Sequence, residues 1–147
     1  MPTAPFRYPS KPPSRGPDNP YVDFTKVVLY TAEDGRAKWR EEKIALGEGN
    51  PQAMLSKVLA ATGYQLRHSP VGFRSQRHCT PQPQWVFILA GEMEIGLQDG
   101  STRLFRPGEH FFSADTLPPG ASFDPGIHGH WSAQRGPRAL ETLFLKT

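Results

Sequence analysis

The sequence predicts an all-β domain, either a sandwich or a closed barrel, and three observations support this. Short apolar or alternating runs recur along residues 21–147, and turn residues separate them. The chain contains 14 glycines and 16 prolines, which interrupt it too often for a helical bundle. Its 147 residues, of which 37% are hydrophobic, are enough for one domain with an ordinary core. We therefore expect many short strands joined by tight turns.

The N-terminal segment is predicted to be an extended arm, because residues 1–20 hold seven of the sixteen prolines. Proline fixes φ and cannot donate a backbone hydrogen bond, so this stretch forms neither a helix nor a ladder of useful length. A tail that wraps its own domain or a second subunit is favoured over a basic arm that binds an anionic partner. The predicted division is this arm followed by one domain over residues 21–147.

The first elements of the domain are predicted to be a hairpin. Residues 21–30 are rich in valine, threonine and aromatic residues, which favour a strand. Asp34 and Gly35 suit a two-residue turn, because a type I′ turn needs positive φ. The charges of residues 37–46 also suit an exposed helix, but the turn before them favours a returning strand.

Residues 50–63 carry local helix signals. Asn50 can cap a helix, Pro51 occupies the first helical position, and Gly63 can end it. Periodicity alone does not assign so short a piece. Helix and strand both remain open for this segment.

The second half has clearer strand patterns. Residues 84–90 are almost continuously apolar, as expected of a strand that is covered on both faces. Residues 92–97 alternate, with apolar side chains on one face and glutamates on the other. Asp99 and Gly100 predict a second hairpin turn. Further strands are predicted over residues 64–68, 73–78, 102–106, 109–114 and 139–146.

A polar pocket above an aliphatic floor is predicted around the apolar strand. Residues of equal parity on an extended backbone point to one face, and such a set begins just before this strand. A histidine beyond two hairpins can return to the same mouth. The predicted pocket residues are His78, Thr80, Gln84, Val86, Ile88 and His130.

These residues carry a resemblance to a known family. Residues 78–84 (HCTPQPQ) and the apolar strand after them resemble the first motif of the cupin superfamily. Residues 107–109 (PGE), followed later by His130, resemble the second motif. The similarity covers residues 63–147 and looks closest to small single-domain bacterial cupins with a His-x-x-Pro-x-x-Gln type of first motif.

The resemblance implies a cupin-type double-stranded β-helix, which is a jelly-roll barrel of antiparallel strands, and it makes residues 53–60 an edge strand of that barrel. The family holds a divalent metal with two histidines and a glutamate from the first motif and a histidine from the second. His78 matches the first ligand and His130 the last. Thr80 stands where the second histidine belongs, and Gln84 where the glutamate belongs.

Three interpretations of the pocket stay open. His78, Gln84 and His130 can hold one divalent transition metal (Fe, Zn, Ni or Mn), more weakly than the usual set because glutamine carries no charge. Without a metal, the same side chains can hydrogen-bond to a small organic ligand. In the third interpretation they only satisfy one another inside a plugged barrel. Two functions are predicted. The first is an enzyme with oxygenase- or isomerase-type chemistry on a small molecule, whose catalytic residues are unassigned. The second is a non-catalytic ligand-binding or sensory module.

Several other residues compete for a role in the pocket. His128 lies two residues before His130, but Gly129 and the residues that follow His130 match the family pattern and favour His130. Cys79 has the opposite parity to His78 and is predicted to point outward. The long spacing before His130 falls in residues 117–126, which form either a lid or a surface insertion.

A homodimer is predicted, because Trp85, Phe87 and Leu89 point away from the pocket and small cupins of this type pair through strands. The net charge of +3 is too small to indicate nucleic acid. No apolar run approaches the length needed to span a membrane. Neither a nucleic acid nor a membrane is therefore expected as a partner. The single cysteine and the absence of an N-terminal secretory pattern favour the cytoplasm.

Overall fold

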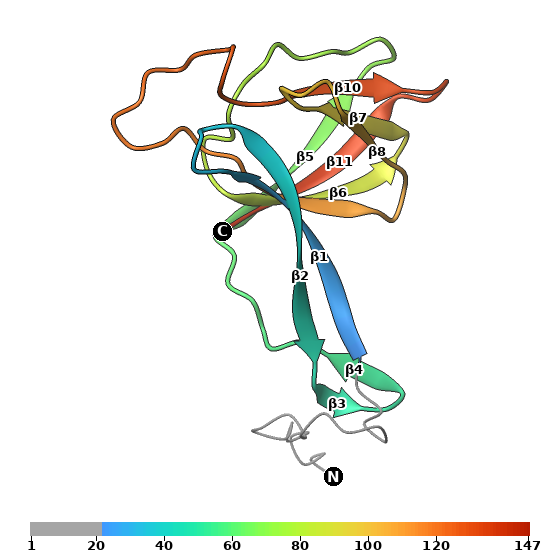
Figure 1. Ribbon diagram of the computed structural model, residues 1–147. Helices are drawn as coiled ribbons and strands as arrows, with labels where there is room; N and C mark the ends of the chain where they lie inside the picture. The colour runs from blue at the N-terminus through green and yellow to red at the C-terminus, as the bar shows by residue number, and fades with distance from the viewer. Residues whose placement is uncertain (1–21) are drawn as a thin grey trace. The chain divides into compact units, whose positions relative to one another are not determined.

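The computed structural model describes residues 22–147, which form eleven strands and no helix (Figure 1). The arm predicted over residues 1–20 lies outside the described residues. None of the described residues belongs to an apolar helix of membrane-spanning length. The strands are β1 (Val22–Thr31), β2 (Ala37–Leu46), β3 (Glu48–Asn50), β4 (Ala53–Leu55), β5 (Gly63–Ser69), β6 (Gln84–Ala90), β7 (Glu92–Gly96), β8 (Thr102–Phe105), β9 (His110–Ala114), β10 (Trp131–Arg135) and β11 (Leu140–Lys146).

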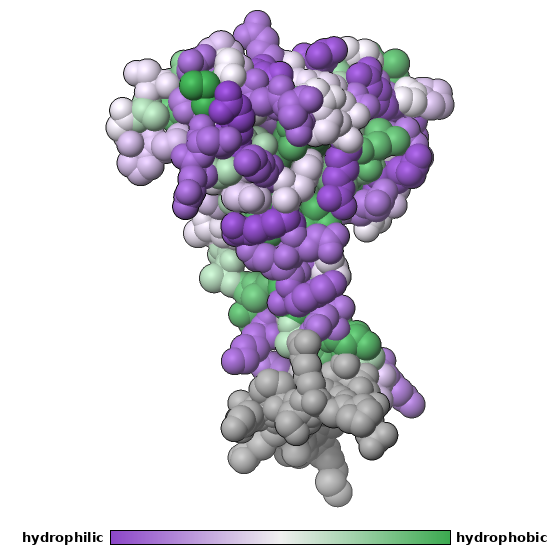
Figure 2. Space-filling model, in the orientation of Figure 1, coloured by the Kyte–Doolittle hydropathy of each residue, from purple (hydrophilic) through white to green (hydrophobic). Residues whose placement is uncertain are grey.

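The described chain divides into two compact units. The larger unit contains residues 26–41 and 61–147, and the smaller one contains residues 22–25 and 42–60. On the side of the larger unit seen in Figure 2, hydrophilic side chains cover most of the surface. The single domain predicted over residues 21–147 stays a prediction.

The larger unit is built from two sheets. One has six strands in the order β2-β1-β9-β6-β11-β5, and the other has three in the order β10-β7-β8. This arrangement confirms the predicted all-β fold of the jelly-roll type. One strand pair, β1 with β9, is parallel, whereas antiparallel pairing was expected. These two strands are far apart in the sequence, so no tight hairpin fixes their relative direction.

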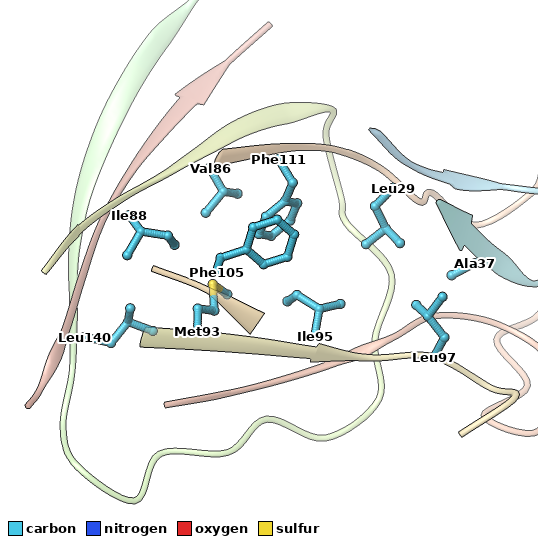
Figure 3. Packing of buried hydrophobic residues seen from close by; sticks show 10 residues of the cluster. All are labelled: Leu29, Ala37, Val86, Ile88, Met93, Ile95, Leu97, Phe105, Phe111 and Leu140. Carbon is cyan, nitrogen blue, oxygen red and sulfur yellow. The ribbon is translucent and has the colours of Figure 1, made fainter. Parts of the chain in front are cut away.

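The core of the larger unit lies between the two sheets. Figure 3 shows Val86 and Phe111, from the six-stranded sheet, pointing toward Met93 and Ile95 of β7. The alternation predicted for residues 92–97 is confirmed, because Met93 and Ile95 are buried there. The buried side chains of this cluster are Leu29, Ala37, Val86, Ile88, Met93, Ile95, Leu97, Phe105, Phe111 and Leu140.

The smaller unit corrects the expectation for residues 53–60. Only Ala53–Leu55 is a strand, and it pairs with β3 in a separate two-stranded sheet rather than at a barrel edge. Residues 56–60 have no regular structure, so the helix is absent as well. The Asn50 side chain accepts hydrogen bonds from the backbone N–H groups of Gln52 (2.9 Å) and Ala53 (3.1 Å). It therefore closes a turn, because the same side-chain chemistry serves helix caps and turns.

Two further predictions in the larger unit need correction. The strand predicted over residues 73–78 forms only two isolated bridges, Arg74 with Ala133 and His78 with His130. Strand β10 was not predicted at all, although it completes the three-stranded sheet. In contrast, β6 has the predicted bounds.

Candidate functional site

A cavity of about 100 Å³ opens inside the larger unit. Buried apolar side chains from β6, β7 and β9 form its base, and half-buried or exposed polar side chains form its mouth. Its volume is well below the roughly 300–1,000 Å³ of sites for drug-sized ligands, so it suits a ligand of few atoms. The lining residues are Arg67, His78, Thr80, Pro81, Gln84, Val86, Met93, Ile95, Phe111, Ser113, His130, Ser132 and Phe144.

The structure brings five of the six predicted pocket residues to this cavity and leaves out Ile88. Ile88 has the parity of Val86, as predicted, but only 2% of it is exposed and it lies in the core cluster. The two residues are about 7 Å apart along the strand. Over that distance the space between the sheets fills with side chains, so the prediction for Ile88 is wrong.

His130 is held by a buried carboxylate that sequence reasoning missed. The Nδ1 atom of His130 lies 2.8 Å from Oδ2 of Asp115, and Asp115 is fully buried. The other carboxylate oxygen, Oδ1, accepts a hydrogen bond from the Thr31 hydroxyl (2.8 Å). A carboxylate at Nδ1 makes that atom the proton donor, which leaves Nε2 as a hydrogen-bond or metal acceptor.

His78 is anchored at the same ring atom. Its Nδ1 lies 2.8 Å from the carbonyl oxygen of Gln76, and a carbonyl can only accept. The centres of the His78 and His130 rings are 4.8 Å apart. None of the described residues is hydrogen-bonded to Nε2 of either ring. Both Nε2 lone pairs are therefore available to a bound species.

The Nε2 atom of His130 reaches the cavity itself. Within residues 22–147, one fully buried side-chain nitrogen or oxygen atom lacks a hydrogen-bond partner. That atom is Nη1 of Arg77. Nε2 of His130 also lacks a hydrogen-bond partner, but it is not among the fully buried atoms. Because His130 lines the cavity, its Nε2 contacts the space inside the cavity.

Backbone pairing brings the two histidines together. The backbone N–H of His78 donates to the carbonyl of His130, and the reverse bond is also made, both at 2.9 Å. Gly129 allows this approach, since its φ is +85° and a Cβ atom there would lie 2.5 Å from the His78 carbonyl oxygen. No residue with a side chain fits at that position without displacing the bridge.

His78 is exposed at one side, but the cavity and its neighbours partly remove the ring from water, and this desolvation lowers the pKa of His78 below its ordinary value. The Gln76 carbonyl opposes this shift, whereas the positive charge of Arg67 adds to it. The imidazole is consequently neutral at pH 7, and its Nε2 lone pair is free to bind.

The Thr80 hydroxyl and the Gln84 amide differ in whether they are free to contact a bound species. The Thr80 hydroxyl is hydrogen-bonded to the hydroxyl of Ser113, and both side chains are buried. The Gln84 side chain is half-buried at the mouth and has no hydrogen bond to any described residue. Gln84, rather than Thr80, is therefore the third group that can contact a bound species.

Sequence reasoning also missed Arg67, Ser113 and Ser132 at the cavity. Asp115 and Ser113 share the parity of the buried Phe111, and this signal was available from the sequence. Arg67 gave no such signal, because it sits on β5 among exposed neighbours.

The competing residues lie elsewhere. His128 is buried in the loop before His130, and its Nδ1 accepts a hydrogen bond from the backbone N–H of Asp124 (3.0 Å). Cys79 does not line the cavity, and burial raises its pKa to about 11, which keeps the thiol protonated. His68 is an exposed residue of strand β5, and its Nδ1 lies 3.7 Å from Oε1 of Glu141.

The donor set at the cavity consists of two imidazole nitrogens and one amide oxygen. Within residues 22–147 no three histidine, cysteine, aspartate or glutamate side chains gather as a metal-binding group. The anchoring of Nδ1 by a carboxylate or a carbonyl is nevertheless the usual outer-shell arrangement of metal-binding histidines. The residues present therefore fit an ion that prefers nitrogen ligands, held by an uncharged set, and do not fit a hard ion such as Mg²⁺ or Ca²⁺.

No protein-family model matches the chain, and no curated protein matches it in sequence. Among solved structures, the cupin domain of Schizosaccharomyces pombe Cnp3 is similar at 15% identity and a TM-score of 0.38, over 87% of this chain and 84% of that one. A Ralstonia eutropha JMP134 structure described as a "putative mannose-6-phosphate isomerase" is similar at 17% identity and a TM-score of 0.33, over 93% and 91% of the two chains. The all-β fold of this chain is established by its own two sheets.

Proposed function

We propose that the cavity binds a small polar organic molecule together with a divalent transition metal held by His78 Nε2, His130 Nε2 and Gln84 Oε1. The observation that carries the proposal is the shared anchoring of both imidazoles at Nδ1. Two histidines that only filled a plugged barrel would have no reason to keep both Nε2 atoms without protein partners beside a cavity. Iron, zinc, nickel and manganese are the candidate ions, as the sequence predicts.

The chain itself supplies binding, orientation and exclusion of water. A bound ion would polarise a ligand oxygen, which is the basis of isomerase- or oxygenase-type chemistry. The Gln84 amide can donate to a ligand oxygen as well as accept. Val86, Met93 and Phe111 form a dry base that keeps bulk water from the inner end of the ligand.

A non-catalytic binding module is the second candidate. It is favoured by the uncharged donor set, since none of the described residues that line the cavity is a carboxylate that could neutralise a divalent ion. In this case the two Nε2 atoms and the Gln84 amide would make hydrogen bonds directly to the ligand. Location in the cytoplasm remains a prediction for either candidate.

The metal proposal is tested by elemental analysis and calorimetric titration of untagged protein with each candidate ion. His78→Ala is the informative variant, because His78 is exposed and its backbone bridge does not need the ring. His68→Ala is the matched control, since His68 is also exposed but lies outside the cavity. We expect one ion per chain in the wild type and the control, and a large loss in His78→Ala. Equal metal binding by both variants, or a folded wild type that binds no ion, would contradict the metal proposal.

We also propose that the chain forms a homodimer through the outer face of β5, β11 and β6. Tyr64, Leu66 and Leu89 are 69%, 71% and 51% exposed there. Trp85 contributes less than the sequence suggested, because it is buried beside Phe87. Sedimentation of wild-type protein should give a mass near twice 16.4 kDa. Leu66→Glu should give a monomer. Val71→Glu is the control, because Val71 is also exposed but lies outside these three strands, and it should remain a dimer. A monomeric wild type would contradict the proposal.

A further inference from the structure

Arg67 places a positive charge at the mouth of the cavity. It lies on β5, opposite Thr142 of β11, and is half-buried. Its guanidinium carbon is 4.6 Å from the centre of the Phe73 ring and 5.8 Å from the centre of the Phe144 ring. These aromatic faces hold the guanidinium group in place without using its hydrogen-bond donors.

No acidic side chain among residues 22–147 forms an ion pair with this guanidinium. Among residues 22–147, the cavity lining contains Arg67 as a cation and no aspartate or glutamate. Asp115 lies behind His130, is fully buried, and is already bonded to His130 and Thr31. Burial also lowers the pKa of Arg67, which reflects the cost of removing its charge from water. An anion in the cavity would offset that cost.

We propose that the ligand is a short carboxylate, bound through its carboxylate group by Arg67 and through its hydrocarbon end by the apolar base. This inference rests on the proposed function, because it requires the cavity to bind a small organic molecule. A guanidinium group matches a carboxylate with two parallel hydrogen bonds. The base formed by Val86, Met93 and Phe111 suits an aliphatic end and offers nothing to a second charged group.

The polar groups between these two ends add a requirement on the middle of the ligand. The Nε2 atoms of His78 and His130 are acceptors, and the Gln84 amide both donates and accepts. A hydroxyl or carbonyl oxygen on the carbon next to the carboxylate would meet these groups. If a divalent ion is also present, the ion and the carboxylate should strengthen each other's binding, because the anion reduces the net positive charge that Arg67 and the ion create together.

Butyrate and butyramide test the charge requirement, since they have nearly the same shape and differ in charge. Binding of each to the full chain, freed of metal by a chelator, would be measured at low ionic strength by calorimetry and by the NMR shifts of the His78 and His130 rings. We expect the wild type to bind butyrate more tightly than butyramide. Arg67→Gln should weaken butyrate binding by about tenfold and remove the preference.

Two variants keep this experiment interpretable. Arg67→Lys retains the charge but not the paired hydrogen bonds, so it should keep part of the preference for butyrate. Arg74→Gln is the matched control, since the Arg74 guanidinium also lies over an aromatic ring, Trp131 at 4.4 Å, but outside the cavity lining. It should bind butyrate as the wild type does.

The outcomes separate this inference from the proposed function. Equal binding of butyrate by the wild type and Arg67→Gln, or equal binding of butyrate and butyramide, would overturn the role of Arg67 while leaving a ligand-binding cavity. If neither probe shifts the two histidine rings, the carboxylate inference is wrong, and the metal titration then decides whether the proposed function survives. If metal binding fails as well, both fall together.

Discussion

The cavity and the loop that precedes it each hold one buried histidine, and the two rings are bonded in opposite ways. In the loop, Nδ1 of His128 accepts a hydrogen bond from the backbone N–H of Asp124. At the cavity, Nδ1 of His130 faces the carboxylate of Asp115 and is the donor. Neutral His128 therefore carries its proton on Nε2, and neutral His130 carries it on Nδ1. Only His130 can offer an Nε2 lone pair, so the bonding of the ring, rather than its burial, distinguishes the candidate functional histidine.

The largest effect is expected at the glycine between these two histidines. Gly129→Ala forces a side chain into a left-handed backbone position and against the carbonyl of His78. We expect a loss of about 2–4 kcal/mol in the free energy of unfolding, together with loss of metal binding. Urea unfolding and the metal titration would measure both.

Gly72→Ala is the matched control for this change. Its φ is +90°, close to that of Gly129, but no atom of the described part of the chain lies within 4 Å of the position of its Cβ. It should lose about 1 kcal/mol and keep its metal. Equal losses in the two variants would show that the approach of Gly129 to His78 has no special role.

Asp115→Asn should have the next largest effect. An amide at this position can offer its N–H₂ group to Nδ1, which favours the other tautomer and places the proton on Nε2. We expect metal affinity to fall by about 10–100-fold, as is typical when an outer-shell partner is removed. Calorimetry would measure this change, and urea unfolding would show how much stability is lost with it.

Asp124→Asn makes the same chemical change in the loop. The Asp124 carboxylate accepts a hydrogen bond from the backbone N–H of Gly126. The hydrogen bond to Nδ1 of His128 comes from the backbone N–H of Asp124 and does not involve its carboxylate. The variant should alter the stability of the loop slightly and leave metal affinity unchanged. A similar fall in affinity in both variants would contradict the separation of the two regions.

The smallest expected effect is the pH dependence of stability that comes from His78. Its pKa in the folded protein lies below the unfolded value of roughly 6.5, since partial removal of the ring from water favours its neutral form. Its contribution to stability is therefore present above that pH, and it is lost as the pH falls through the folded pKa. Unfolding free energies at pH 7.5 and 5.5 should differ more for the wild type than for His78→Gln. An identical pH dependence in the two proteins would be the contrary result.

The sequence pattern predicted those strands whose buried side chains are apolar. Strand β6 has its predicted bounds because its inward residues are buried and two of its outward residues, Trp85 and Phe87, are also largely covered, whereas Leu89 is exposed. Strand β10 escaped prediction because its inward residues are polar: Ser132 and Gln134 are 3% and 4% exposed. Gln134 is satisfied there by the backbone, since its Nε2 donates to the carbonyl of Arg138 (2.7 Å) and its Oε1 accepts from Gly72 (2.9 Å). Burial of this kind leaves no hydrophobic pattern to detect.

The candidate site could be predicted only in part for a related reason. Parity placed Thr80, Gln84 and Val86 correctly, because the chain before and within β6 is extended. On β5 the apolar Tyr64 and Leu66 are exposed and Arg67 faces the cavity, which reverses the expected alternation. The anchoring of His130 by Asp115 depends on two residues brought together by the fold, and only Asp115's parity hinted at it.

Metal and ligand binding at the cavity both depend on which nitrogen of the His130 ring carries the proton, and nitrogen-15 NMR of the imidazole side chains at pH 7.5 measures this directly. We predict that His130 has a protonated Nδ1 and an unprotonated Nε2, and that His128 shows the reverse. A protonated Nε2 on His130 would contradict the account, because the cavity would then lack the lone pair on which both metal and ligand binding depend.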